Sequence, residues 1–144
     1  MMTENCERLL EALDPRQKEA VLINEGSLLV FAGAGSGKTR VITTKIAWII
    51  ENNLAKPWEI LAVTFTNKAC NEMRERVANF VGEETAANCM IKTFHSFGVW
   101  LLRRYGQRVG LSRNFTIYDD SESAALLKQC FPEPSAAAGD TPRL

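Results

Sequence analysis

The sequence is poor in histidine and cysteine and has no long apolar run, and each shortage narrows the classes of protein it can encode. Its one histidine, His95, argues against a histidine-rich metal site. The four cysteines are far apart and form no C-x-x-C pair, which indicates reduced thiols and predicts a cytoplasmic protein. No apolar run reaches the roughly 18–20 uncharged residues of a membrane helix, so we expect no membrane partner. The N-terminus carries acidic residues where a secretory signal would carry basic ones.

Composition and charge are those of a globular protein with a local basic region. The 144 residues are 46% hydrophobic and 24% charged, which excludes wholesale disorder and fits one domain. Lys+Arg and Asp+Glu both number 17, which excludes a uniformly basic protein that binds nucleic acid over its whole surface. Residues 61–114 nevertheless carry eight basic and four acidic side chains, whereas residues 1–26 and 115–144 each sum to −3. This excess allows a DNA-binding face, although a solvated face is the commoner meaning of such a run.

Hydrophobic periodicity predicts alternating strands and helices. Short apolar runs predict strands at residues 27–31, 60–65 and 89–93. Helical spacing and caps predict helices at residues 3–13, from Asp14-Pro15 onward, and at 41–50, 68–81, 95–107 and 121–131. Gly82 is expected to end the fourth of these helices. The order predicts an α/β fold with a doubly wound parallel sheet, followed by an unstructured Pro/Ala/Gly-rich end. The helix at 95–107 is apolar nearly all round, and we expect it to pack on residues that are absent from this sequence.

A glycine-rich loop lies between the first predicted strand and the next helix. Ala32-Gly33-Ala34-Gly35-Ser36-Gly37-Lys38-Thr39 fits the Walker A pattern, with alanine in place of its first glycine. Glycines let successive backbone N–H groups cradle phosphate oxygens, and the following helix adds its N-terminal dipole. Lys38 can reach the β- and γ-phosphates, and Thr39 can place its hydroxyl on Mg²⁺. The alternative is an ordinary glycine turn at the start of a helix. The loop predicts a nucleoside triphosphate site without saying which reaction uses it.

The segments on both sides of this loop are more specific. Taken together with it, they resemble the N-terminal part of the UvrD/Rep-type superfamily 1 DNA helicases over residues 13–131. Four segments in the family's order carry the resemblance: Leu13-Asp14-Pro15-Arg16-Gln17 (Q motif), Ala32–Arg40 (phosphate loop), Leu61–Ala69 (motif Ia) and Thr93-Phe94-His95-Ser96 (motif Ib).

The resemblance implies an ATP site in a P-loop NTPase of the RecA-like type. Gln17 would hydrogen-bond adenine and favour ATP over GTP, and Arg40 would lie near the same base. Each has a plain alternative as a surface residue of a helix. Lys38 and Thr39 would be the catalytic residues of this part of the enzyme, with Thr39 holding Mg²⁺ through the nucleotide. The loop residues that would bind ATP are Ala32, Gly33, Ala34, Gly35, Ser36, Gly37, Lys38 and Thr39.

The same resemblance implies contacts with single-stranded DNA. Phe65, at the carboxyl end of the second predicted strand, would stack on a base, a contact worth about 1–3 kcal/mol for any base. The alternative is that Phe65 is one more core residue, and Asn67 could be no more than a helix cap. A catalytic triad around His95 lacks a nucleophile and an orienting group. The residues that would contact DNA are Thr64, Phe65, Thr66, Asn67, Thr93, His95 and Ser96.

The acidic residue that P-loop enzymes need to hold Mg²⁺ and orient water is not found after any strong strand. Residues 115–120 come nearest to it, since they form a short apolar run that ends in two carboxylates. The run is half polar, however, and Asp120 fits better as a helix cap. We therefore expect residues 1–95 to be the front of a RecA-like domain and residues 96–131 the start of a helical insertion. Residues 132–144 are expected to be a disordered tail.

The predicted function is that of the ATP-binding front segment of a 3′–5′ DNA helicase acting in repair or replication, incomplete and inactive by itself. Its partners would be ATP, Mg²⁺, single-stranded DNA and the remainder of the helicase. A second possibility is a non-catalytic nucleotide- or DNA-binding module that needs a partner chain. A third, a small P-loop kinase, lacks lid arginines and leaves motifs Ia and Ib without a role.

Overall fold

The structure is a computed structural model that describes residues 4–131. The chain divides into two compact units, Met1–Leu101 and Leu102–Leu144, which are treated separately below. The tail predicted at residues 132–144 lies outside the described residues.

The first unit begins with three helices, α1 (Glu4–Glu11), α2 (Pro15–Leu22) and α3 (Lys38–Glu51). Asp14 caps α2 as predicted: its carboxylate accepts from the Gln17 amide at 2.9 Å, and the Gln17 side-chain oxygen accepts from the Asp14 amide at 3.2 Å. Leu13 and Val21 pack on Trp48 of α3 and bury it. The pair α1–α2 is thereby fixed to the helix that follows the glycine-rich loop.

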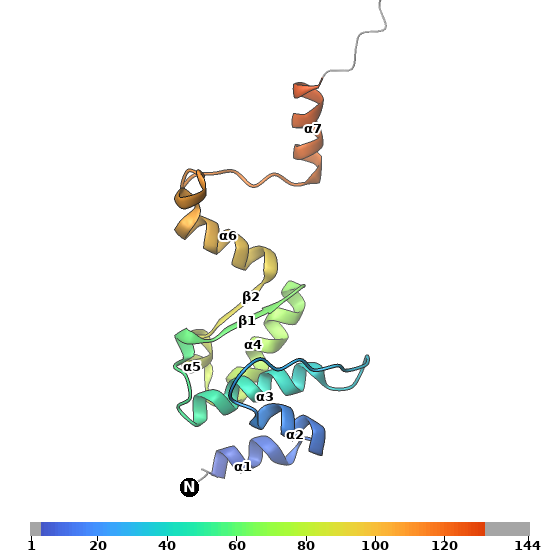
Figure 1. The fold of residues 1–144 in the computed structure, drawn as a ribbon, viewed down its shortest axis with the longest axis vertical. Coiled ribbons are helices and arrows are strands. Elements are labelled where there is room, and N and C mark those ends of the chain that lie inside the picture. Colours follow the sequence, from blue (N-terminus) through green and yellow to red (C-terminus); the bar gives the residue numbers. More distant parts are fainter. Residues whose placement is uncertain (1–3, 132–144) are drawn as a thin grey trace, which may run out of the picture. The chain divides into compact units, whose positions relative to one another are not determined.

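The sheet consists of β1 (Leu61–Thr64) and β2 (Met90–Thr93), which lie side by side in parallel, with Thr64 opposite Thr93 (Figure 1). The short helix η1 (Pro57–Glu59) leads into β1, and α4 (Asn67–Val81) and α5 (Glu83–Ala87) connect the two strands. Gly82 ends α4 with a φ of +85°, as predicted. The core is an apolar cluster between the sheet, α3, α4 and α5, made of Ile46, Ala62, Met73, Val77, Ala86, Cys89 and Ile91. Burial raises the pKa of the Cys89 thiol.

The strand predicted at residues 27–31 is absent, and that prediction is wrong. The segment has no regular structure, and its side chains are exposed, Leu29 by 75% and Phe31 by 90%. The apolar run was assigned to a buried strand, yet a strand forms only where a neighbour accepts its backbone hydrogen bonds. The described sheet consists of β1 and β2 alone, and segment 27–31 pairs with neither strand. An apolar groove of about 370 Å³ separates the segment from β1, lined among others by Leu28, Val30, Ile42, Ile46 and Leu61.

This exposure predicts the effect of a double substitution, Leu29→Lys with Phe31→Lys. Because neither side chain is buried, we expect the free energy of unfolding to change by less than about 0.5 kcal/mol. An unpaired apolar segment also favours contacts between copies, so sedimentation should show less self-association than for the unchanged chain. A loss of several kcal/mol in chemical denaturation would instead mean that these residues are buried, as the sequence pattern predicted.

Beyond β2 the chain is helical. Helix α6 (Phe94–Tyr105) contains the boundary between the two units, and η2 (Gly106–Val109) and α7 (Asp120–Cys130) follow it. No residue of α6 is buried in the structure, so residues 4–131 do not supply the cover that its apolar circumference predicted. Asp119, rather than the predicted Asp120, caps α7: it accepts from the Glu122 amide at 2.8 Å. Among the helices of residues 4–131, none has the length and apolar character to cross a membrane.

Candidate functional site

The glycine-rich loop connects the exposed segment 27–31 to the first turn of α3. Gly35 and Gly37 have φ angles of +75° and +83°, the left-handed conformation that side chains disfavour. The Ser36 hydroxyl donates to the Gly33 carbonyl at 2.7 Å and closes the loop on itself. No side chain caps the N-terminus of α3, so its first amides are left for another acceptor. The local sequence therefore builds a tight turn that ends at an uncapped helix.

Gln17 connects this loop to α2. Its side-chain NH₂ donates to the Ser36 carbonyl at 3.0 Å, while its oxygen completes the α2 capping box. The approach is close: a Cβ on Gly37 would lie 2.9 Å from the Gln17 nitrogen. Gln17 is thus a half-buried side chain held at both ends, and the alternative of a solvent-facing helix residue does not describe it.

Lys38 places its ammonium on the loop backbone. Its Nζ donates to the carbonyls of Ala32 at 3.1 Å and Gly33 at 2.6 Å. Beside it is a cavity of about 270 Å³, and the predicted ATP residues among its lining are Gln17, Ala32, Gly33, Ser36 and Lys38. The cavity also has an apolar side formed by Ala20, Val30, Phe31 and Val41. It therefore combines a cation, an amide and an apolar wall, as a small anionic ligand with a flat ring requires.

The other predicted ATP residues are not among those lining this cavity. Ala34 and Gly35 are exposed in the loop, and Thr39 is half-buried on α3, where its carbonyl accepts from the Thr43 hydroxyl at 3.0 Å. Arg40 is exposed and donates to the Ala12 carbonyl at 3.2 Å, so it ties α3 to the end of α1.

Lys45 is a residue that the sequence analysis missed. Its Nζ donates to the carbonyls of Val21 (2.8 Å) and Ile23 and to the Asn24 side chain (2.9 Å), which fixes the end of α2 to α3. Partial burial lowers the pKa of this lysine. The role of Lys45 could not be predicted from its neighbours in the sequence, because its hydrogen-bond acceptors lie more than 20 residues away along the chain.

A second candidate site lies at the carboxyl ends of the two strands. Phe65 follows β1 and Phe94 follows β2, and their ring centroids lie 5.1 Å apart at 43°. Phe65 is 84% exposed, so the alternative that it belongs to the core is wrong. The parallel register brings the two predicted DNA segments together. Phe94 was overlooked because only its neighbours in the Thr93–Ser96 motif were singled out.

The polar residues at these strand ends differ in what they are free to do. The Thr66 hydroxyl accepts from the Ala69 amide at 3.1 Å and caps α4, so Thr66 rather than Asn67 is the cap. Thr93 is buried and exchanges hydrogen bonds with Ser96, whose hydroxyl receives the Thr93 amide at 3.0 Å. Asn67 and His95 are exposed. Thr66 and Ser96 are exposed too, but their hydroxyls are engaged in local hydrogen bonds. The exposed members of this edge outside those bonds are Phe65, Asn67, Phe94 and His95.

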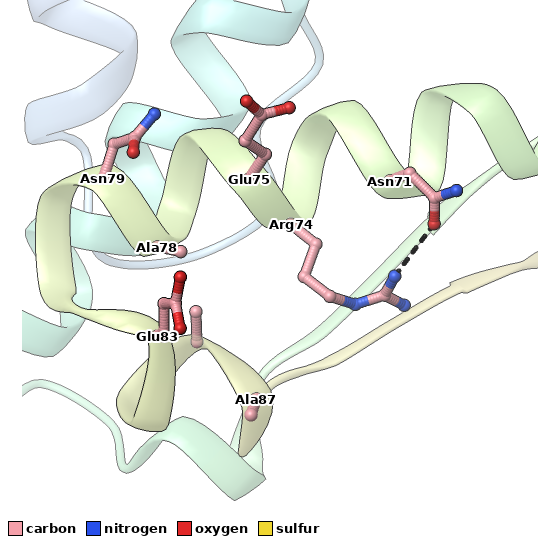
Figure 2. Close-up of a pocket in the computed structure, with 8 residues that line it drawn as sticks. Asn71, Arg74, Glu75, Ala78, Asn79, Glu83 and Ala87 are labelled. Carbon is pink, nitrogen blue, oxygen red and sulfur yellow. Dashed lines mark hydrogen bonds between the residues drawn. The ribbon is translucent and has the colours of Figure 1, made fainter.

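Figure 2 shows a larger cavity, about 450 Å³, that lies away from both sites and between α4 and α5. Arg74 crosses it: one guanidinium nitrogen donates to the Asn71 side chain at 3.1 Å, and the other donates to the Ile91 carbonyl at 2.8 Å (the first bond is drawn in Figure 2). The arginine thereby ties α4 to β2, and Glu75 and Glu83 give the remaining lining a negative charge. Its lining contains no lysine and no glycine, and its two carboxylates would repel phosphate, so its size alone makes it no nucleotide site.

The fold and site define an α/β protein in which a glycine-rich loop with a lysine precedes a helix beside a parallel sheet. Residues 13–141 match the UvrD/REP helicase N-terminal domain. The chain therefore belongs to the UvrD/REP helicase family.

Individual relatives are similar over most of this chain but over little of their own length. The ATP-dependent DNA helicase PcrA of Leuconostoc citreum is 49% identical over 125 residues, which are 87% of this chain and 17% of the relative. PcrA of Bacillus subtilis (strain 168) is 48% identical over 126 residues, 88% of this chain and 17% of the relative. PcrA of Staphylococcus aureus (strain COL) is 48% identical over 120 residues, 83% of this chain and 16% of the relative. The chain thus spans about one-sixth of these helicases.

Proposed function

We propose that this chain is the ATP- and DNA-binding front segment of an ATP-dependent 3′–5′ DNA helicase that works in repair or replication. The observation that carries the proposal is the cavity beside the glycine-rich loop, where Lys38 and Gln17 meet. The similarity to the PcrA proteins, which are ATP-dependent DNA helicases, supports it.

The residues around the loop fit a magnesium nucleotide. Lys38 would bind phosphate oxygens with an ammonium that the loop carbonyls already position, and the uncapped amides of α3 would add donors. Gln17 would read the edge of the base with the amide that now holds Ser36. Thr39 would hold Mg²⁺ together with phosphate oxygens, because its hydroxyl supplies the oxygen ligand that this cation prefers and Thr39 directly follows Lys38. Bound ATP supplies the energy for movement along DNA.

The exposed residues at the carboxyl ends of β1 and β2, with Phe65 and Phe94 at their centre, fit single-stranded DNA. We call this surface the aromatic edge. An exposed phenylalanine stacks on any base, which an enzyme that moves along a strand requires. Phe65 and Phe94 would offer such a platform, with Asn67 and His95 beside it for the sugar-phosphate backbone. We assign the contact with single-stranded DNA to the aromatic edge.

Hydrolysis by the chain alone is not part of the proposal. Of the described strands, β1 is followed by Phe65-Thr66-Asn67 and β2 by Phe94-His95-Ser96, and neither sequence contains a carboxylate. A P-loop enzyme needs an acidic group there to hold Mg²⁺ and orient water. We therefore expect binding of ATP without turnover.

A second candidate function is favoured by the apolar groove between segment 27–31 and β1. Its lining and the unpaired segment suit a strand supplied by another polypeptide, such as the remainder of the helicase. The chain would then be a binding module that acts after assembly. The double substitution Leu28→Lys and Leu29→Lys would weaken that assembly and leave nucleotide binding unchanged, because neither side chain lines the cavity beside Lys38.

The proposed function is tested by the base preference of the nucleotide site. We expect a fluorescent ATP analogue to bind roughly tenfold more tightly than the matching GTP analogue. The Gln17 amide can hydrogen-bond the edge of adenine, whereas guanine does not offer it the matching donor and acceptor. Gln17→Glu keeps the oxygen that completes the capping box but removes the NH₂ donor, so the ratio of the two affinities should fall toward one. Gln129→Ala, on exposed α7, is the control and should keep the ratio. Failure of the unchanged chain to bind either nucleotide would overturn the proposal.

A further inference from the structure

The second unit contains a concentration of arginine that neither candidate site uses. Residues 102–118 include four arginines, Arg103, Arg104, Arg108 and Arg113, and no acidic residue. All four are exposed. This short stretch therefore has a charge of +4, whereas the net charge of the whole chain is zero. We call these four arginines, with Tyr105, the arginine patch.

The turn that carries the patch is well defined. The Leu111 amide donates to the Gly106 carbonyl at 2.9 Å, and a Cβ on buried Gly106 would lie 3.2 Å from that of Leu111. Arg103 holds the far end: it donates to the Arg113 carbonyl at 2.6 Å, and its guanidinium lies 4.2 Å from the Phe115 ring centroid. Arg103 therefore organises the turn, and the other arginines are presented by it.

Two arginines share one aromatic ring. The guanidinium carbons of Arg104 and Arg108 lie 5.9 Å and 5.8 Å from the Tyr105 centroid, and Tyr105 is 45% exposed. Stacking on a ring preserves the arginine charge and leaves N–H donors at the edge of the guanidinium plane. In residues 4–131, Arg108 and Arg113 make no ion pair or hydrogen bond through their side chains.

Two nearby carboxylates, those of Asp119 and Glu122, are engaged elsewhere. Asp119 accepts from the Ser121 hydroxyl at 2.6 Å and from the Glu122 amide, bonds that lower its pKa, and the Glu122 carboxylate accepts from the Asp119 amide at 3.0 Å. They cap α7 instead of neutralising the arginines. In the part of the chain that the structure describes, no carboxylate forms an ion pair with Arg108 or Arg113, so the charges of these two side chains are left for a ligand.

From this charge and its aromatic support we infer that the arginine patch binds the phosphate backbone of DNA. Guanidinium groups match phosphate oxygens in pairs, and a ring between them can stack on a base. The inference rests on the proposed function, since it assigns a second contact region to the same ligand. It differs from the aromatic edge at Phe65, because it depends on charge and therefore on salt.

The test removes two charges that the turn does not need. Arg108→Gln with Arg113→Gln leaves Arg103 in place, and Arg8→Gln with Lys56→Gln removes the same charge from exposed positions of the first unit. The full chain is titrated into a fluorescein-labelled 20-nucleotide oligothymidylate, and in parallel into a 20-base-pair duplex, between 50 and 200 mM NaCl. Each phosphate contact contributes about 0.7 to the slope of log K against log salt on a single strand.

We expect the Arg108/Arg113 variant to bind the single strand roughly tenfold more weakly at low salt, with a slope shallower by about 1.4. Arg108→Lys with Arg113→Lys should restore most of the slope. Loss on the single strand alone assigns the patch to single-stranded DNA, and loss on both probes assigns it to any DNA backbone. Affinity and slope equal to those of the Arg8/Lys56 control on both probes would overturn the inference.

The two proposals fail separately. Binding of the ATP analogue should be the same in the Arg108/Arg113 variant and in the unchanged chain. A chain that binds no nucleotide, but whose DNA binding depends on Arg108 and Arg113, would refute the proposed ATP site and keep the arginine patch.

Discussion

Lys38→Ala is expected to weaken binding of the ATP analogue roughly 10- to 100-fold. The estimate follows from the loss of a charged hydrogen-bond donor, worth about 1.5–3 kcal/mol. The structure places the Lys38 ammonium on the carbonyls of Ala32 and Gly33, at the edge of the cavity, before any ligand arrives. Little side-chain freedom then remains to be lost on binding, so most of the interaction should appear in the measured affinity. Titration with the fluorescent analogue in the presence of Mg²⁺ measures the loss.

The matched control is Lys56→Ala, which removes an exposed lysine before η1. It should leave nucleotide affinity within about twofold, because exposed charges far from a ligand are screened. Lys38 is itself exposed, so its removal should change the free energy of unfolding by less than about 1 kcal/mol. Equal affinities for the Lys38 and Lys56 variants would show that the loop does not bind phosphate.

The elements that could be predicted from the sequence are those with local signals. Asp14-Pro15 predicted the start of α2, and Gly82 predicted the end of α4, because caps act over three or four residues. The strands expected at 60–65 and 89–93 are present as Leu61–Thr64 and Met90–Thr93. Glu72 and Arg76, four residues apart on α4, form an ion pair at 2.5 Å, another contact that local spacing favours.

The elements that could not be predicted depend on partners far along the chain. Segment 27–31 has an apolar pattern typical of a buried strand, but hydrogen-bonding neighbours, and not the pattern, decide whether a strand forms. The same holds for α6, whose apolar circumference predicted a covering partner that residues 4–131 do not supply. In both cases the apolar pattern indicates that a surface needs a packing partner, but it does not identify that partner.

The candidate sites were predictable as motifs and not as contacts. The glycine-rich loop and the Phe65 segment were identified from residue types alone, since phosphate cradles and exposed aromatics have restricted compositions. The bonds of Gln17 to Ser36 and of Lys45 to Val21 join residues 19 and 24 positions apart, and nothing in the local sequence marks them. Arg40 shows the reverse: a residue predicted near adenine lies instead against the Ala12 carbonyl. Its role in binding ATP stays a prediction.

The second large effect is expected from Ile91→Ala, in the middle of β2. Ile91 is 2% exposed and packs against Ala62, Met73 and Val77, so it joins the sheet to α4. Replacing a buried isoleucine by alanine costs about 2–5 kcal/mol through lost transfer free energy and the cavity left behind. Small domains have about 5–15 kcal/mol in total, and this substitution would remove a large part of it.

The measurement has to report on the first unit alone, because the second contributes its own helices to any average signal. Amide hydrogen exchange of α4 meets this need: its protected amides should exchange about 30-fold to several thousand-fold faster in the Ile91→Ala variant, the equivalent of 2–5 kcal/mol. Ile117→Ala makes the same chemical change at a position that is 53% exposed and should alter exchange by less than about threefold. Because the Ile91 carbonyl also accepts from Arg74, a smaller effect than that of Arg74→Ala would place the link between α4 and β2 in this hydrogen bond instead of the apolar core.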